Sequence, residues 1–310
     1  MDNIQEKLIN IVQSGKNTSQ KSSHWLKHTE GFSFKDGRVE GINGFSSRSR
    51  RMPGSGFIHE ILQKRNFADL PIPTQSAWYS AAKFTCRLQG RSLDLCMLRH
   101  VFTLDHLAKN LNLHQTKSVC VIGDGQANFA SLAITSSFFE KIISINLPEV
   151  LLSDWELINK LNLKEKTEVL ESESEIESFL KSDKRLGLIA ASDSTILYNK
   201  PIDLFVNIAS FQEMKNETIL DYFKLIKSST SGAAFYCCNR REKMLYGGEV
   251  IRFEDYPWEG FKHLITDEKC PWHQHYYLLR RNKFIPTPMT RIPYDGTHDH
   301  RLALYPPAKT

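Results

Sequence analysis

The residues best suited to bind a ligand form a glycine loop, Gly123-Asp124-Gly125. This loop directly follows a short apolar run from Ser118 to Ile122 and precedes a segment with helical spacing from Ala127 to Phe139. Glycine allows a ligand to approach the backbone closely, and the first turn of a helix presents free N–H groups. A buried strand, a glycine turn and a helix in this order predict a cofactor loop. The alternative is an ordinary glycine turn that binds no ligand.

Two kinds of cofactor use this layout. Dinucleotide enzymes carry the longer pattern GxGxxG, in which the glycines seat a pyrophosphate at the start of the helix. Asn128 stands at the third position here, so the match to that pattern is imperfect. A cofactor without phosphate needs only the shorter GxG, because an amino-acid moiety lies against the loop instead. The sequence therefore favours S-adenosylmethionine, and a nicotinamide-dependent oxidoreductase is the weaker alternative.

Three further segments carry a more specific pattern. They are Asn146-Leu-Pro-Glu149, Asp203-Leu-Phe-Val-Asn-Ile-Ala-Ser-Phe-Gln-Glu-Met214 and Asp267-Glu-Lys-Cys-Pro-Trp-His-Gln-His-Tyr-Tyr277. With the glycine loop they resemble the bacterial sugar O-methyltransferase family, within the class I S-adenosylmethionine-dependent methyltransferases, over roughly residues 75 to 282. The resemblance implies a Rossmann-like domain, S-adenosylmethionine as methyl donor, and a hydroxyl of a sugar or glycosylated small molecule as acceptor.

The chain departs from the family's pattern at three positions. Val121 stands where the first strand commonly carries an acidic residue, and Ala127 replaces the last glycine of the usual GxGxG. Asn146 replaces the acid that binds the ribose hydroxyls at the end of the second strand, although an amide also donates and accepts hydrogen bonds. These departures support an alternative function, a non-catalytic Rossmann-like binding or scaffold protein descended from such an enzyme.

The other candidate cofactor residues lie where the predicted strands end. Asn207 is close to the carboxyl end of a strand, where doubly wound sheets bind ligands, although the protein itself can equally satisfy a buried amide. Asn146 has a similar alternative as a turn residue. The full set of expected cofactor-binding residues is Gly123, Asp124, Gly125, Ala127, Asn146, Leu147, Ala191 and Asn207.

His273 is the expected general base of the reaction. The unperturbed pKa of histidine, about 6.5, leaves the ring mostly neutral at pH 7 and able to accept a hydroxyl proton. Asp267 and Glu268 precede it and are expected to orient the imidazole, and Trp272 to shield the pocket. These last three residues form the predicted substrate-binding set. In the competing interpretation His273 only satisfies a buried strand end and Glu213 is the base, and loss of the proton to water is a third alternative.

No metal site is predicted. Asp193 follows the run that ends at Ala191 and is a candidate either to line the adenine pocket or to bind magnesium, but no carboxylate triplet accompanies it. His298 and His300 lie in a Thr-His-Asp-His stretch, which we expect to be a solvated tail rather than a metal site.

The candidate residues must be positioned by strands that alternate with helices. The β-like runs are Ser118–Ile122, Ile142–Leu147, Leu186–Ala191, Ile202–Ala209 and Ala233–Cys238. This alternation predicts an α/β fold with a Rossmann-like, doubly wound, mostly parallel sheet. Strand character at residues 276–280 predicts an antiparallel C-terminal edge, and the proline-rich end of the chain is expected to wrap the surface.

Residues 1–115 are predicted to form a polar N-terminal arm and a mainly helical module, and residues 116–310 the Rossmann-like methyltransferase domain. Ile4, Leu8 and Val12 have the spacing of a helix, whereas the polar stretch that follows, to about residue 55, is typical of a loop. Apolar residues recur at helical spacing again between residues 57 and 113.

Composition and charge limit the class of protein. The chain has 310 residues, 41% of them hydrophobic, and a formal net charge of +5, which indicate a globular protein without a nucleic-acid partner. Arg48, Arg50 and Arg51 come nearest to a basic stripe and are expected in a solvated loop. The six cysteines lack the spacing of a disulfide framework, which indicates reduced thiols. No apolar stretch approaches the roughly 20 residues of a membrane span. No secretion signal is visible. We expect a cytoplasmic enzyme with a small sugar-like acceptor and no membrane partner, and leave a homodimer open.

Overall fold

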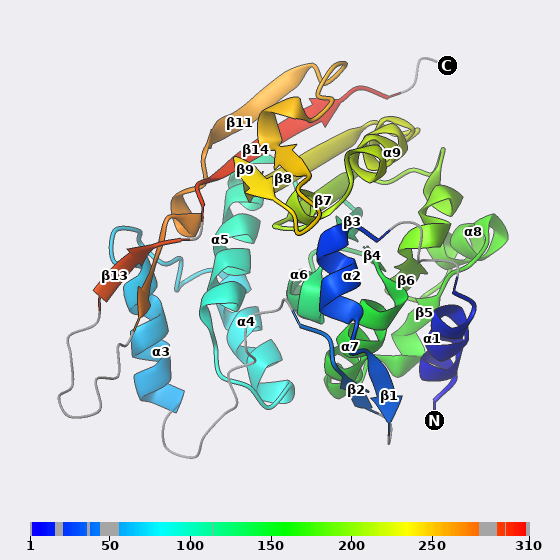
Figure 1. Cartoon of the computed structure of the whole chain (residues 1–310), viewed down its shortest axis with the longest axis horizontal. Coiled ribbons are helices and arrows are strands. Elements are labelled where there is room, and N and C mark those ends of the chain that lie inside the picture. Colours follow the sequence, from blue (N-terminus) through cyan, green and yellow to red (C-terminus); the bar gives the residue numbers. More distant parts are fainter. Residues whose placement is uncertain are drawn as a thin grey trace.

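A central eight-stranded sheet organises the molecule (Figure 1). The computed structural model describes residues 2–15, 21–35, 38–43, 56–113, 115–278, 290–294 and 296–307, so Arg48, Arg50 and Arg51 lie outside the described residues. The strand order is β11-β14-β8-β7-β3-β4-β6-β5. The strands are β3 (Ser118–Ile122), β4 (Lys141–Asn146), β5 (Thr167–Val169), β6 (Leu186–Ala190), β7 (Leu204–Ile208), β8 (Ala233–Arg240), β11 (His263–Lys269) and β14 (His298–Tyr305).

Strands β3 to β8 run parallel to one another, and β14 pairs antiparallel with both β8 and β11. This arrangement confirms the predicted Rossmann-like, mostly parallel sheet with an antiparallel C-terminal edge. Val119 and Val121 of β3 pack into the core on one face of the sheet, and Cys120 and Ile122 into the core on the other. Because successive side chains of a strand point to opposite faces, a strand that is apolar throughout needs cover on both.

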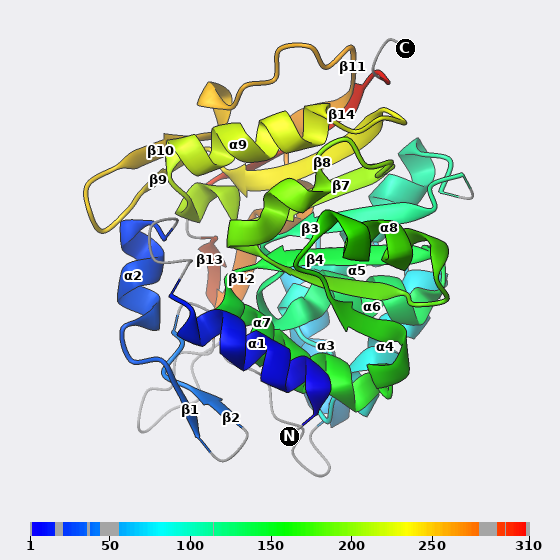
Figure 2. The same ribbon diagram turned by 90° about the vertical axis from the view of Figure 1, so that its right-hand side faces the viewer.

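Helices provide that cover on both faces (Figure 2). The face of Cys120 and Ile122 is covered by α8 (Glu173–Lys181) and α9 (Asn216–Lys227). The face of Val119 and Val121 is covered by α1 (Asn3–Gln13), α4 (Ala77–Leu88), α5 (Leu95–Asn110), α6 (Asn128–Ser136) and α7 (Pro148–Ile158). The sheet is therefore doubly wound.

The N-terminal part of the chain supplies helices to the same core as the sheet. Ile4 and Leu8 of α1 are buried where α1 packs on α7, which confirms the helix predicted from their spacing. The helical pattern after residue 57 is confirmed as α3 (Gly56–Lys64), α4 and α5. The stretch expected to be a loop contains α2 (Ser23–Thr29) and a hairpin of β1 (Ser33–Lys35) and β2 (Arg38–Glu40), so that expectation is wrong there. The division of the chain at residue 115 stays a prediction.

The C-terminal strands differ from the expectation. β14 lies inside the sheet between β8 and β11 rather than wrapping the surface, because its alternate residues His298, His300 and Leu302 are fully buried. β12 (His275–Leu278), the described part of the run expected at 276–280, pairs with β13 (Thr290–Pro293) outside the main sheet. β9 (Glu242–Met244) and β10 (Val250–Arg252) form another hairpin. No helix among the described residues is long and apolar enough to span a membrane.

Candidate functional site

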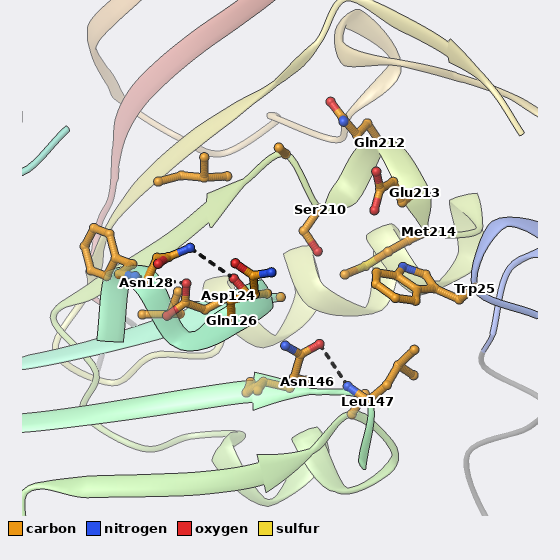
Figure 3. A pocket seen from close by; sticks show the side chains of 18 of the residues that line it. Trp25, Asp124, Gln126, Asn128, Asn146, Leu147, Ser210, Gln212, Glu213 and Met214 are labelled. Carbon is orange, nitrogen blue, oxygen red and sulfur yellow. Dashed lines mark hydrogen bonds between the residues drawn. The ribbon is translucent and has the colours of Figure 1, made fainter. Parts of the chain in front are cut away.

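A pocket lies at the carboxyl ends of β3, β4 and β7 (Figure 3). The chain order reverses at β3, which has β4 on one side and β7 on the other. Doubly wound sheets bind their ligands at such a switch point. The cavity has a volume of about 280 Å³ and is lined by the loops after β3, β4, β6 and β7, by α2 and α5, and by C-terminal residues that include His273 and Tyr294.

The glycine loop forms one wall of this pocket. Gly123 has a φ of +74°, and a Cβ added there would lie 1.8 Å from the Ser210 hydroxyl. Glycine is therefore required at this position both by its backbone conformation and by the loop after β7. Gln126 and Ala127 follow with φ values of 65° and 48°. This left-handed conformation costs roughly 1–2 kcal/mol for a residue that carries a Cβ, so alanine in place of the usual glycine introduces strain at the site.

Asp124 caps the helix that follows the loop. Its carboxylate oxygens accept hydrogen bonds from the N–H groups of Phe129 (3.0 Å) and Ala130 (2.6 Å) in the first turn of α6. Burial raises the pKa of Asp124 to about 6, although these two hydrogen bonds and the charge of Arg91 act to lower it. The carboxylate thus occupies the helix N-terminus, which is the place where dinucleotide-binding folds hold a pyrophosphate.

The loop after β4 forms a second wall. Asn146, Leu147 and Ala191, all expected in the cofactor site, line the pocket. Asn146 accepts a hydrogen bond from the Leu147 N–H (3.0 Å, Figure 3) and donates one to the buried carboxylate of Asp154 (3.2 Å). The amide therefore stabilises its own turn, and its Oδ1 keeps a second lone pair with which to accept a ligand's hydroxyl.

Two expected cofactor residues do not line the pocket. Ala127 is fully buried behind the pocket surface. Asn207 donates from Nδ2 to the Ile122 carbonyl (2.9 Å), and its Oδ1 accepts from Phe211 N–H (3.1 Å) and Asn239 Nδ2 (2.8 Å). The amide therefore joins β7 to β3 and shapes the loop after β7, which corresponds to the structural alternative for this residue.

Glu213 lines the pocket, but two basic side chains hold it. Lys243 Nζ lies 2.6 Å from Oε1, and His24 Nε2 lies 3.4 Å from Oε2. Burial alone would raise the pKa of Glu213, but the contacts with His24 and Lys243 outweigh it and hold the pKa below its usual value. Ser22, which caps α2, also donates to the Glu213 carbonyl. Glu213 therefore anchors α2 and β9 at the pocket, and its paired carboxylate is a poor proton acceptor.

His273 also lines the pocket. Its Nδ1 lies 3.2 Å from Cys270 Sγ and 3.6 Å from Cys238 Sγ, so Nε2 is the ring nitrogen left for the pocket. Burial, followed by the positive charge of Arg99 and by neighbouring histidines, lowers the pKa of His273 well below its usual value. The ring is therefore neutral at pH 7 and has an unprotonated nitrogen, and its lowered pKa makes it a weaker base than an ordinary histidine.

The same three side chains also form a group of potential metal ligands. The ligand atoms of Cys238, Cys270 and His273 lie within 4.8 Å of one another, and no other such group occurs in the described part of the chain. Two thiolates and one imidazole are a ligand set that zinc accepts. His298 and His300 do not form the expected solvated tail, because both are buried in β14. Asp193 does not line the pocket.

The three residues expected to bind the substrate are not among those that line the pocket. Asp267 and Glu268 lie on β11, where Asp267 forms an ion pair with Arg301 of β14 (2.8 Å). Glu268 lies 3.5 Å from Nε2 of His300, whose pKa is lowered by burial to about 4, so that ring is neutral at pH 7. Neither carboxylate contacts His273. Trp272 is buried, and its ring stacks on Phe102 at a centroid distance of 5.8 Å. The expected orientation of His273 by acidic residues is therefore replaced by contacts with two thiols.

Two walls of the pocket were not anticipated. Residues 21–25, at the start of α2, contribute Lys21, Ser22 and Trp25, and α5 contributes Arg99 and His100. The wall from α5 had a signal in the sequence, because two basic residues interrupt an apolar helical pattern. The wall from residues 21–25 had none, since only the long-range contacts of α2 place it over the pocket.

Comparisons with known proteins give neither a family nor a curated relative, because no family model and no curated protein matches the chain. Among solved structures, a Thermoplasma acidophilum protein is 10% identical with a TM-score of 0.44, over 74% of this chain and 97% of that one. The partner of the Haloferax volcanii Trm112 methyltransferase activator is 12% identical with a TM-score of 0.44, over 76% and 100%. An Aquifex aeolicus S-adenosylmethionine-dependent methyltransferase is 14% identical with a TM-score of 0.39, over 64% and 88%. With every one of these scores below 0.5, function has to be argued from the site itself.

Proposed function

We propose that this chain is an enzyme, an S-adenosylmethionine-dependent O-methyltransferase that acts on a hydroxyl of a sugar or glycosylated small molecule. The observation that carries the proposal is the Asp124 carboxylate at the N-terminus of α6, directly behind a GxG loop. A pyrophosphate at this helix would meet a buried carboxylate, so the site disfavours a nicotinamide dinucleotide. An adenosine cofactor without phosphate meets no such repulsion.

The walls of the pocket suit the parts of that cofactor. Gly123 and Gly125 line the pocket without side chains where the amino-acid moiety would lie, and Asn146, which also lines it, would bind the ribose hydroxyls. Leu147 and Ala191 provide apolar surface for the adenine ring. When bound, S-adenosylmethionine supplies an activated methyl group. The remaining task of the protein is to align the acceptor and to accept one proton.

We assign the proton to Nε2 of His273. The ring is buried and neutral and reaches the pocket, whereas Glu213 is already paired with Lys243 and His24. Nε2 would accept the hydroxyl proton as the acceptor oxygen takes the methyl group, and S-adenosylhomocysteine would be the other product. For Nε2 to accept it, Nδ1 must carry the ring's own proton and donate it to the sulfur of Cys270 or Cys238.

The test is methyl transfer from labelled S-adenosylmethionine to a panel of sugars and glycosides. His273→Ala is expected to lower turnover by roughly 10²–10⁴-fold and to leave the affinity for S-adenosylhomocysteine unchanged. Glu213→Gln is the matched control, because it removes the charge and keeps the shape. Turnover of His273→Ala within a few-fold of wild type would pass the base role to Glu213. Cofactor binding without transfer to any hydroxyl would favour the non-catalytic alternative.

A further inference from the structure

The pocket contains a buried arginine that pairs with no carboxylate of the described residues. Arg99, on α5, is 4% exposed and lines the pocket. Its Nε donates to the Trp272 carbonyl at 3.0 Å, and the Tyr294 ring covers one face of the guanidinium, with 4.0 Å between Cζ and the ring centroid. Within the residues that the structure describes, Nη2 has no hydrogen-bond partner and no carboxylate pairs with Arg99.

A buried positive charge of this kind is unfavourable unless a ligand supplies a negative charge to pair with it, because buried ions are normally paired and hydrogen-bonded. Other charged side chains at the pocket have partners. Lys21 pairs with Glu149 at 2.6 Å, and Asp124 caps α6. Arg99 differs from them, and so does its neighbour His100, whose Nδ1 is buried at the pocket without a partner among the described residues.

Arg99 lies at the end of the pocket that contains the proposed base. The carbonyl that it holds belongs to Trp272, which directly precedes His273. Tyr294, which covers the guanidinium, has its ring centroid 5.9 Å from that of His273. Burial has the largest effect on the pKa of His273, and the charge of Arg99 has the second largest. An acceptor that transfers its proton to His273 therefore lies within reach of Arg99.

We infer that the methyl acceptor carries an anionic group, a carboxylate or a phosphate, and that Arg99 binds it with His100 as a second donor. This inference rests on the proposed function and narrows its acceptor from sugars in general to acidic or phosphorylated ones. The guanidinium is held on one face and at Nε. Its Nη2 is buried and has no hydrogen-bond partner among the described residues, so Nη2 is the nitrogen that an anion would satisfy. The planar fork of arginine matches both anions, which explains the choice of arginine over lysine.

Calorimetric titration of the protein saturated with S-adenosylhomocysteine tests this inference. The probes are inorganic phosphate, D-glucuronate and D-glucose at constant ionic strength, so that phosphate and carboxylate are tested separately. We expect at least one of the two anions to bind, and glucuronate, if it binds, to bind about tenfold or more tightly than glucose. Arg99→Met is expected to remove anion binding, a loss of at least tenfold or about 1.4 kcal/mol. Arg87→Met, at an exposed arginine of α4, is the matched control.

Several outcomes overturn the inference. Wild type that binds neither anion contradicts it, and so does equal anion affinity in wild type and Arg99→Met. Loss of S-adenosylhomocysteine affinity in Arg99→Met, with unchanged affinity for methylthioadenosine, would assign Arg99 to the carboxylate of the cofactor instead. Wild type that does not bind S-adenosylhomocysteine would refute the proposed function separately, and the anion titrations without cofactor would still decide the role of Arg99. If Arg99→Met does not fold, Arg99→Gln replaces it.

Discussion

Replacement of His100 by phenylalanine is expected to make the protein more resistant to acid. The ring packs edge-on against Phe129 with the centroids 5.9 Å apart. Burial, and then the charges of Arg91 and Arg99, lower the pKa of His100 to about 3. In the unfolded chain the pKa of histidine is about 6.5. Between these values the unfolded state binds a proton that the folded state does not, so stability that is complete above pH 6.5 is lost as the pH falls.

The size of the effect follows from the separation of the two pKa values. Each pH unit between them contributes about 1.36 kcal/mol to the free energy of unfolding. From pH 7 to pH 4.5, the loss due to His100 is therefore about 2.5 kcal/mol. The result depends little on the folded-state pKa, because pH 4.5 still lies above it. Domains are typically stable by about 5–15 kcal/mol, so a change of this size is measurable.

Urea unfolding of wild type and His100→Phe at pH 7 and pH 4.5 measures it. The difference in unfolding free energy is expected to shift by about 2.5 kcal/mol in favour of the variant at the lower pH. Asp124 is present in both proteins, so its contribution to the pH dependence of stability cancels in the comparison. Its raised pKa alone would make the folded state more stable as the pH falls. His263→Phe, at an exposed position, is the control and should follow wild type. Equal pH dependence of wild type and His100→Phe would refute the reasoning.

Ala127→Gly is expected to change the free energy of unfolding by less than about 1 kcal/mol, because relief of about 1–2 kcal/mol of left-handed strain is offset by the greater flexibility of glycine in the unfolded chain and by the loss of a buried methyl group worth about 0.8 kcal/mol. Urea unfolding measures this, and a loss of about 2 kcal/mol or more, on the order expected for a methyl group packed without strain, would contradict the strain. Asn146→Asp replaces a donor to Asp154 by a second carboxylate, so at pH 7 it should lower stability by about 1–3 kcal/mol. Thermal unfolding checks this, and an unchanged melting temperature would count against the contact. Elemental analysis of the purified protein should find no stoichiometric zinc, because a metal on Nδ1 of His273 would leave the ring proton on Nε2. One zinc per chain, lost in Cys270→Ser, would refute the assignment of the base.

The fold was predictable where apolar residues recur along the sequence at the regular spacing of a strand or a helix. In β3, alternate residues pack on opposite faces, and the strands that follow alternate with amphipathic helices. β14 was not predictable in this way, because His298 and His300 are polar residues in a central strand. His300 is buried with its Nδ1 3.1 Å from the Tyr236 hydroxyl, so its partner comes from the neighbouring strand. Only the paired sheet reveals that contact.

The site was predictable where it is local. The glycine loop, Asn146 and Ala191 each lie at the carboxyl end of a strand that the sequence predicts, and they line the pocket. Their binding of a cofactor stays a prediction. The wall made by α2 depends on contacts between Glu213, His24 and Lys243, which are far apart in the sequence. Proximity in sequence was misleading for Asp267 and Glu268, because they lie on an edge strand that is paired with β14.

The central claim is that the pocket binds an adenosine cofactor without phosphate. Calorimetric titration of the wild-type chain with S-adenosylhomocysteine, and separately with NAD, tests it most directly. We predict a dissociation constant on the order of micromolar for S-adenosylhomocysteine, no binding of NAD at the same concentrations, and loss of binding in Gly125→Val with an unchanged circular dichroism spectrum. Binding of NAD in preference to S-adenosylhomocysteine, or binding of neither, would contradict the account.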